Sequence, residues 1–192
     1  MSSQEENTTK ISLNHAEFIV LGLIAEFPSH AYNINKRIEE RGMRNWTSIG
    51  KSSIYRVIKR LEKKGLTNKW LEEVDNRILK VYKITENGSR LLKEKVFSTI
   101  REFLGRNDEN FYVAFSMLPI LTYEQQIEAF THSINTLKTH KEELENMLEA
   151  NSHMPLNVRG LFIHPIKILE TDIGFLGLVL DEIQNGGEKK NK

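Results

Sequence analysis

The 192-residue sequence predicts a mainly helical protein that has one short β-hairpin and two parts of opposite charge. Apolar residues recur at helical spacing along most of the chain, and two short runs near residue 75 are rich in β-branched and aromatic residues. Residues 30–83 contain 14 Lys and Arg against 6 Asp and Glu, whereas the remainder contains 13 against 20. Such a split is typical of a polyanion-binding module joined to one that avoids the polyanion, and chance clustering of solvated lysines is the alternative.

The composition excludes several classes of protein. Cysteine is absent, so thiolate zinc sites, cysteine nucleophiles and disulfides are excluded, and only His, Asp and Glu could hold a metal. The longest stretch without a charge has 14 residues, from Asn110 to Tyr123, whereas a membrane span needs about 20 apolar residues. The polar, acidic N-terminus lacks the order of a secretory signal. We therefore expect a cytoplasmic protein with no membrane segment.

The first two helices are predicted from a residue that can cap a helix start and from Pro and Gly residues that end helices. Asn14 is a suitable N-cap for a helix over 16–27 that is apolar nearly all round and therefore buried or self-associating. Pro28 ends this helix. A second helix is expected over 30–43, with its apolar residues on one stripe and a stop near Gly42.

The third helix has one apolar and one cationic face, and Gly65 is expected to end it as a C′ glycine. Either Ser52 or Ser53 can cap its start. The apolar stripe consists of Ile54, Val57, Ile58 and Leu61. The other face carries Ser52, Arg56, Lys59 and Lys63.

A β-hairpin is expected directly after the third helix, because residues 66–72 and 78–84 favour strands and Asp75-Asn76 favours a turn. Three short helices followed by a hairpin are the order of a winged helix-turn-helix. Its helix can enter the major groove of B-DNA, where Lys and Arg neutralise phosphates and Arg can also reach guanine edges. Arg77 and Lys80 lie near the hairpin tip, where they can meet the flanking backbone. Winged helices also dock proteins, so a protein interaction module without DNA reading is the alternative.

The motifs resemble those of the PadR-type transcriptional regulators over about residues 14–92. The run Leu21-Gly22-Leu23-Ile24 is followed by His30-Ala31-Tyr32-Asn33-Ile34, Ser52-Ser53-Ile54-Tyr55, Leu61-Glu62-Lys63-Lys64-Gly65-Leu66 and Tyr82-Lys83-Ile84-Thr85-Glu86-Asn87-Gly88. The pieces are common, but their order and spacing are specific. The family usually has His-Gly-Tyr at residues 30–32 and Gly-Thr or Ser-Thr at 52–53, and neither departure removes a side-chain donor.

The chemistry and the resemblance together name the candidate DNA-binding residues. They are Tyr32, Lys51, Ser52, Ser53, Tyr55, Arg56, Lys59, Asn76, Arg77 and Lys80. The resemblance further implies a repressor, because relatives of this type usually occlude promoters. It leaves the sign of regulation and the existence of a small-molecule effector open.

The C-terminal half is predicted to be helical and to form a homodimer. Thr85 is a good N-cap for a long helix through Phe103, and two later helices have apolar seams at alternating steps of three and four. The first seam is Ile127, Phe130, Ile134, Leu137, Leu144 and Leu148, with Lys141 as its polar position. The second supplies the candidate dimer interface, Phe162, Ile166, Leu169, Ile173, Leu176 and Leu180. Pro165 should kink that last helix or lie near its start. A helical bundle closed within one chain is the alternative.

The expected organisation is a flexible tail over 1–12, a winged helix-turn-helix over 13–92, a helical dimerisation domain over 93–185 and a flexible tail over 186–192. A homodimer sets two recognition helices one DNA turn apart and predicts an inverted-repeat operator.

No enzyme, metal site or cofactor is expected. The six histidines lack metal-ligand spacing, and the glycine-rich phosphate loop and the nucleophile elbow are missing. The aromatic residues leave two interpretations open, a helical core or an effector cavity. They are Trp46, Trp70, Phe111, Tyr112 and Phe115.

Overall fold

The computed structural model describes residues 11–50, 54–74, 77–106 and 108–190. Two compact units meet in sequence between Leu92 and Lys93. The boundary falls within helix α4, Glu86–Arg101, so this helix contributes residues to both units. The architecture is mainly helical with a small antiparallel sheet, as the sequence predicted. Within the described ranges, no helix combines the length and apolar character that a bilayer span requires.

The first unit begins with a buried helix. Helix α1, His15–Glu26, starts at a capping box in which the side chains of Asn14 and Glu17 each accept from the other residue's backbone N–H. It ends before Pro28, and most of its apolar side chains are fully buried, which confirms the prediction from its all-round apolar pattern. Helix α2, Ala31–Glu40, follows, then a 3₁₀ turn, η1, Met43–Asn45.

Helix α3, Ile54–Lys63, buries the apolar stripe that the sequence predicted, with at most 1% of each side chain exposed. It ends in a Schellman motif: the N–H of Leu66 donates to the carbonyl of Leu61, and the N–H of Gly65 donates to that of Glu62. Gly65 has a φ of 69°, a left-handed conformation that glycine adopts without a steric penalty. The tight turn delivers the chain directly into the hairpin.

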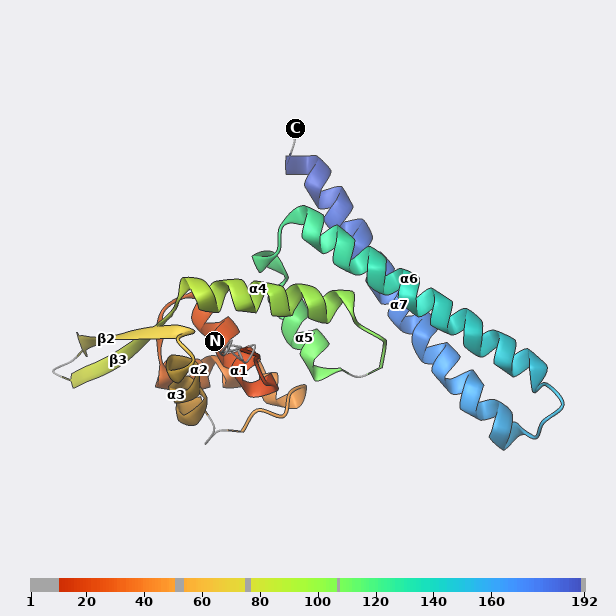
Figure 1. Cartoon of the computed structure of the whole chain (residues 1–192), viewed down its shortest axis with the longest axis horizontal. Coiled ribbons are helices and arrows are strands. Elements are labelled where there is room, and N and C mark those ends of the chain that lie inside the picture. Colours follow the sequence, from red (N-terminus) through yellow and green to blue (C-terminus); the bar gives the residue numbers. More distant parts are fainter. Residues whose placement is uncertain (1–10, 51–53, 75–76, 107, 191–192) are drawn as a thin grey trace, which may run out of the picture. The chain divides into compact units, whose positions relative to one another are not determined.

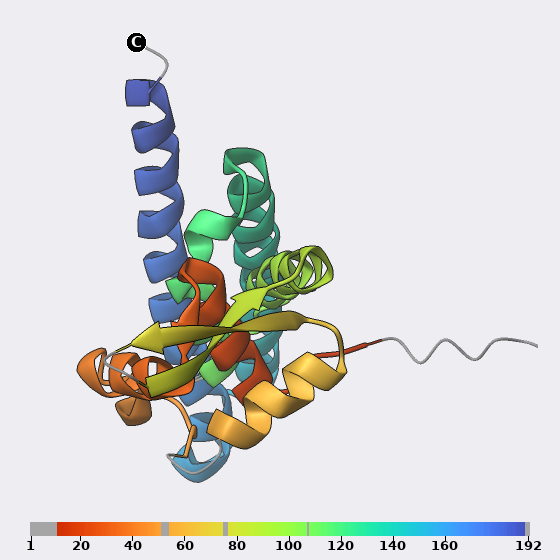
Figure 2. The ribbon, with the colours of Figure 1, turned by 90° about the vertical axis from the view of Figure 1, so that its left-hand side faces the viewer.

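The sheet has one strand more than the hairpin that the sequence predicted. Strands β2, Thr67–Val74, and β3, Arg77–Ile84, form the hairpin, which we call the wing. Strand β1, Ser29–His30, adds to the other edge of β3 and pairs Ser29 with Tyr82. Two residues are too few to show a strand period, so only the fold reveals β1. Figures 1 and 2 show α2 and α3 on the same side of the wing.

The second unit contains α5, Glu109–Ser116, a 3₁₀ turn, η3, Leu118–Ile120, and two long helices, α6, Tyr123–Ala150, and α7, Leu156–Lys190. Helices α6 and α7 form an antiparallel hairpin, and α7 extends past the start of α6 (Figure 1). An aromatic cluster packs beside them, in which the rings of Phe103 and Phe111 are stacked with their centroids 4.0 Å apart. Phe111 therefore belongs to the core, one of the two interpretations of the aromatic residues.

Two features of α7 refine the sequence analysis. Pro165 lies inside the helix, nine residues after Leu156, so the helix does not begin at this proline. Pro165 removes the N–H that would pair with the carbonyl of Leu161, a residue that is exposed and so accessible to water. The helix also continues to Lys190, through most of the stretch that was expected to be a flexible tail.

Candidate nucleic-acid interface

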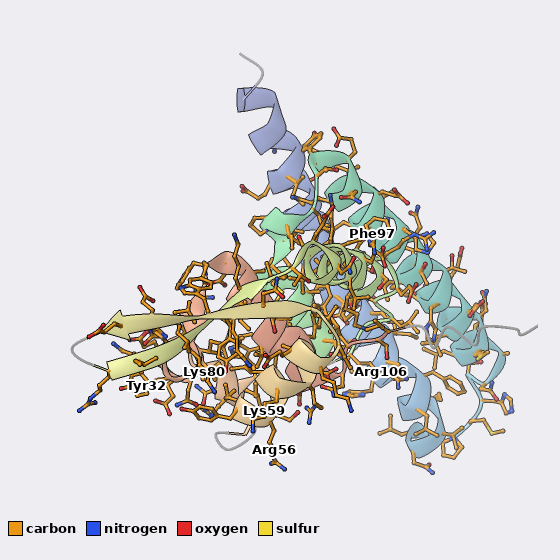
Figure 3. The ribbon with its side chains drawn as sticks, turned by 60° about the vertical axis from the view of Figure 1, so that its left-hand side comes forward. Tyr32, Arg56, Lys59, Lys80, Phe97 and Arg106 are labelled. Carbon is orange, nitrogen blue, oxygen red and sulfur yellow. The ribbon has the colours of Figure 1, made fainter. Side chains whose placement is uncertain are left out.

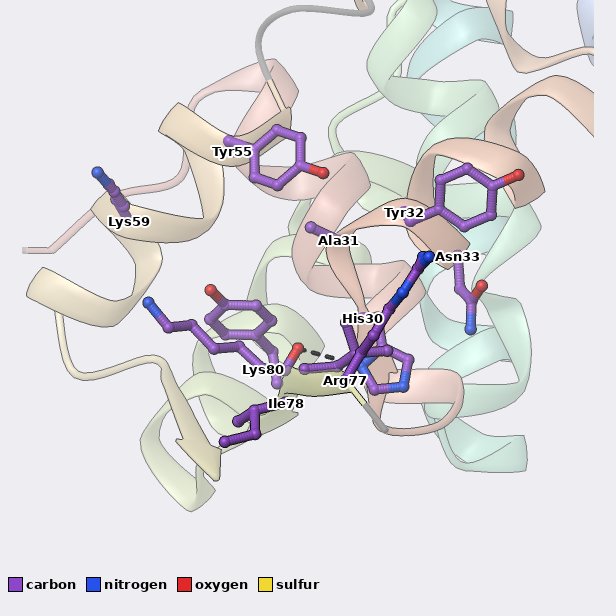
Figure 4. Close-up of a pocket in the computed structure, with 11 residues that line it drawn as sticks. His30, Ala31, Tyr32, Asn33, Tyr55, Lys59, Arg77, Ile78 and Lys80 are labelled. Atoms are coloured by element: carbon purple, nitrogen blue, oxygen red, sulfur yellow. Dashed lines mark hydrogen bonds between the residues drawn. The ribbon is translucent and has the colours of Figure 1, made fainter. Parts of the chain in front are cut away.

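The start of α2, one face of α3 and strand β3 enclose a cleft of about 840 Å³ in the first unit (Figure 4). Its lining includes three tyrosines and three basic residues. These are Tyr32, Tyr55, Tyr82, Lys59, Arg77 and Lys80. The cleft therefore brings together cationic groups and phenol donors from three separate segments of the chain.

Helix α3 presents its cationic face to solvent. Arg56 and Lys59 are exposed, opposite the buried stripe that packs α3 onto α1 and α2. Figure 3 shows the side chain of Arg56 extending away from the ribbon. An exposed guanidinium on a helix can reach a base edge or a phosphate.

Two other basic residues, Arg60 of α3 and Lys64 directly after it, stabilise the fold by pairing with Glu17. Glu17 of α1 is 1% exposed, and its carboxylate accepts from Lys64 Nζ at 2.7 Å and from Arg60 Nε at 3.3 Å. Burial by itself raises the pKa of Glu17, but the hydrogen bonds from Lys64 and the Asn14 backbone, with the charge of Lys64, hold the pKa below its usual value. The pairs hold the end of α3 against the start of α1.

A second ion-pair cluster fixes α2. The buried side chain of Arg37 donates to Ser29 Oγ at 2.7 Å and to Glu26 at 3.2 Å, and its guanidinium lies 4.0 Å from the ring centre of Phe27. Arg41 holds the same carboxylate through both terminal nitrogens. Burial raises the pKa of Glu26, but the hydrogen bond and charge of Arg41 outweigh it and lower the pKa. The excess of positive charge in residues 30–83 thus overstates the charge available to a ligand.

The wing is tied to the helices at two points. His30 Nδ1 lies 3.2 Å from the carbonyl oxygen of Lys80, and its Nε2 lies 3.8 Å from the carboxylate of Glu72. Lys69 of β2 forms an ion pair with Glu62 of α3. Sequence reasoning missed these contacts, because their partners are distant in the sequence and only the fold pairs them.

The structure brings five of the ten predicted DNA-binding residues together around the cleft. They are Tyr32, Tyr55, Lys59, Arg77 and Lys80. All five are exposed, with Tyr32 at 69% and Tyr55 at 63%. Arg56 is exposed on α3 but does not line the cleft. Lys51, Ser52, Ser53, Asn76 and the turn that includes Asn76 lie outside the described residues.

The structure gives the burial of the six residues of the predicted dimer interface within a single chain. Ile166, Leu169 and Leu176 are buried within the single chain, at 5%, 4% and 0% exposure. Phe162, Ile173 and Leu180 are half-buried. Half of this seam is therefore buried inside the second unit, where α6 and α7 pack along their length.

The described part of the chain contains no group of three or more side chains that could hold a metal ion. The cleft offers positive charge and hydroxyl donors from α2, α3 and β3. These groups suit phosphate oxygens, which accept most of the hydrogen bonds in protein–DNA complexes. Burial also raises the pKa of Tyr82, so its phenol stays protonated as a donor.

The fold and the cleft define the class: the first unit is a winged helix-turn-helix domain. Residues 20–94 match the family model described as the transcriptional regulator PadR-like family. This match over residues 20–94 confirms the resemblance predicted from the motifs. The family comprises regulators, in agreement with the expectation that the chain is not an enzyme.

Several solved structures are also similar to this chain. Bacillus subtilis PadR in complex with operator DNA shares 18% identity at a TM-score of 0.40, over 87% of this chain and 98% of that one. The PadR-like regulator BC1756 from Bacillus cereus shares 17% identity at a TM-score of 0.38, over 89% and 99%. The protein smu.1704 from Streptococcus mutans shares 25% identity at a TM-score of 0.35, over 48% and 92%. No curated protein matches the chain.

Proposed function

We propose that the protein is a homodimeric, sequence-specific DNA-binding repressor that reads an inverted-repeat operator. The observation that carries the proposal is the exposed cationic surface formed by Arg56, Lys59, Arg77 and Lys80 on two neighbouring elements. A basic helix beside a basic hairpin offers contacts to a groove and to the flanking backbone of the same duplex. Repression follows physically if the operator overlaps a promoter.

In this proposal α3 enters the major groove and the wing contacts the adjacent backbone. Arg56 reads a base edge, because it projects from α3 outside the cleft. Lys59 and the wing residues Arg77 and Lys80 hold the phosphates of the strand that passes over the cleft. Tyr32 and Tyr55 add hydroxyl donors to that strand.

The dimer is proposed to form through α7. Leu178 is 69% exposed, and Leu180 and Ile183 are only half-buried in the single chain. A helix whose last turns leave large apolar side chains exposed or half-buried gains stability from a partner that covers them. Two-fold symmetry then places equivalent α3 helices on half-sites about one DNA turn, 34 Å, apart.

A protein-docking module is the second candidate, and one observation favours it. Leu71 and Ile78 of the wing are 63% and 71% exposed. Exposed apolar side chains on a hairpin suit a protein partner better than phosphates. The two candidates differ in their response to salt, because phosphate contacts release counterions and make affinity fall steeply with salt concentration.

A gel-shift assay with genomic fragments, including the DNA upstream of the protein's own coding sequence, tests the proposal. We expect one or a few fragments to be retained in the presence of excess random duplex, with affinity that falls as salt rises. Retention of every fragment alike would contradict sequence-specific reading. Absence of any shift at low salt would favour the docking module.

We also propose that a small effector regulates DNA binding. The support is a cavity in the second unit that is separate from the DNA-binding cleft.

A further inference from the structure

The cleft of the first unit presents two tyrosine rings to solvent. Tyr32 of α2 and Tyr55 of α3 are 69% and 63% exposed, whereas the third tyrosine of the cleft, Tyr82, is buried. Neither exposed side chain forms a hydrogen bond with any residue that the structure describes. An aromatic ring contributes most of its binding free energy through the apolar area that it buries. Both rings therefore have that area available for a ligand.

The charged side chains of the same cleft are all basic. Lys59 of α3 and Arg77 and Lys80 of β3 line it, and their side chains form no ion pair with any described residue. Among the described residues that line the cleft, none is Asp or Glu. Figure 4 shows the rings of Tyr32 and Tyr55 on the helices, with Arg77 and Lys80 on the strand across from them. A ligand held between these walls meets cations and aromatic faces together.

A duplex that passes over the cleft uses its charge but not its ring faces. The bases of a duplex are paired and stacked on one another, so the outer surface of each strand presents phosphates and sugars. A phosphate can accept from a tyrosine hydroxyl but does not cover a ring. The bases of an unpaired strand can turn outwards and stack on aromatic side chains. The cleft volume of about 840 Å³ lies in the range of small-molecule pockets, about 300 to about 1,000 Å³, which suits unpaired nucleotides.

We propose that the cleft also binds single-stranded DNA, with bases stacked on Tyr32 and Tyr55 and the backbone held by the three cations. A positively charged groove with aromatic side chains is the arrangement that binds unpaired strands without sequence preference. Ile78, an exposed residue that lines the strand side of the cleft, adds an apolar contact for a base. This binding does not rest on the proposed reading of an operator, although a duplex uses the same cations.

Fluorescence anisotropy of the full-length protein with a labelled oligothymidylate of about eight nucleotides tests the proposal. We expect saturable binding that weakens as the salt concentration rises. A strand of the same length that lacks all its bases keeps the phosphates but cannot stack. It should bind at least about fivefold more weakly, which corresponds to the loss of one stacked base.

Substitutions at the two rings separate stacking from hydrogen bonding. Tyr32→Leu and Tyr55→Leu each remove a ring and should weaken binding of the oligothymidylate at least about fivefold. Tyr55→Phe removes only the hydroxyl and should retain most of the affinity. Tyr123→Leu, at an exposed position at the start of α6, is the matched control and should bind as the wild type does. All three tyrosines are exposed, so each variant should keep the melting temperature of the wild type.

Three results would each overturn the proposal. They are equal affinity for the oligothymidylate and the base-free strand, unchanged affinity in both leucine variants of the cleft, and an equal loss in Tyr55→Phe and Tyr55→Leu. A gel shift with duplex DNA on the same samples reports the proposed function separately. Binding of the oligothymidylate without a shift of any duplex would contradict the proposed function alone. A duplex shift without saturable binding of the oligothymidylate at low salt would contradict single-strand binding alone.

Discussion

His30 Nδ1 lies 3.2 Å from the carbonyl oxygen of Lys80, so the residue that precedes α2 holds the middle of the wing (Figure 4). Strand β1 reinforces this contact by pairing His30 with Val81. The wing residues Arg77 and Lys80 therefore have a defined position relative to the helices of the same unit. DNA contacts on two elements act together only if the distance between the elements is maintained.

His30→Ala should weaken DNA binding without unfolding the domain. The substitution removes one side-chain hydrogen bond, which contributes about 0.5–1.5 kcal/mol, and loosens the wing. Fluorescence anisotropy with a retained fragment should show a few-fold loss of affinity, while His132→Ala, on an exposed position of α6, should show none. Equal affinity of the two variants would mean that the contact does not position the wing.

Arg56→Ala and Lys59→Ala should have different effects. If Arg56 reaches a base, its loss costs about 1–3 kcal/mol of specific binding and relaxes the sequence preference at one position. Loss of Lys59 should lower the affinity for all DNA sequences alike. It should also reduce the slope of log affinity against log salt concentration by about 1. Both residues are exposed, so the melting temperature should change little. If the double variant bound its best site as tightly as the wild type, α3 would not be the recognition helix.

Arg77→Glu should reduce affinity for specific and random duplex together. Arg77 is exposed at the start of β3, where its charge can meet the phosphate backbone, and charge reversal replaces attraction by repulsion. Anisotropy with random duplex at two salt concentrations measures this effect. Unchanged binding to random duplex would indicate that the wing contacts protein.

Glu17→Gln should destabilise the protein at neutral pH. It should also make the free energy of unfolding depend less on pH in the acidic range. The folded-state pKa of Glu17 is below the ordinary value of 4.5, so its ion pairs stabilise the fold above that pH and are lost as the pH falls through the lowered pKa. Denaturant unfolding should show a loss of about 1–3 kcal/mol at pH 7 and a smaller difference once the pH falls below the lowered pKa of Glu17. Glu142→Gln, on the exposed face of α6, is the control. A pH-independent difference would refute this role for the carboxylate.

Leu178→Glu should dissociate the proposed homodimer. Leu178 is 69% exposed, so a charge there is tolerated in the single chain but not at an apolar interface. Sedimentation velocity should show monomers for Leu178→Glu and dimers for Leu161→Glu, a matched leucine that is 71% exposed near the other end of α7. Leu169 and Leu176 are unsuitable for this test because both are buried within the chain. A wild-type protein that sediments as a monomer with full operator affinity would refute the dimer.

Much of the first unit could be predicted from local patterns. The capping box at Asn14, the stripe from Ile54 to Leu61 and the glycine at Gly65 each determine their structure through neighbours in the sequence. Strand β1 could not be predicted in this way, because its structure depends on pairing with residues more than 50 positions away. Some basic residues pair with Glu17 or Glu26 and others face solvent. Which of them do so depends on distant partners for the same reason.

The sequence by itself determined the order of the elements, the basic character of α3 and the wing, and the motifs of a PadR-like domain, because caps, breakers and periodicity act locally. Only the tertiary structure decided which charged side chains face a ligand and which face of α7 packs inside the chain. It buried Leu169 and Leu176 and left Leu180 only half-buried, although all three belong to the same predicted seam. Periodicity identifies an apolar face, but which surface covers that face depends on how distant segments pack.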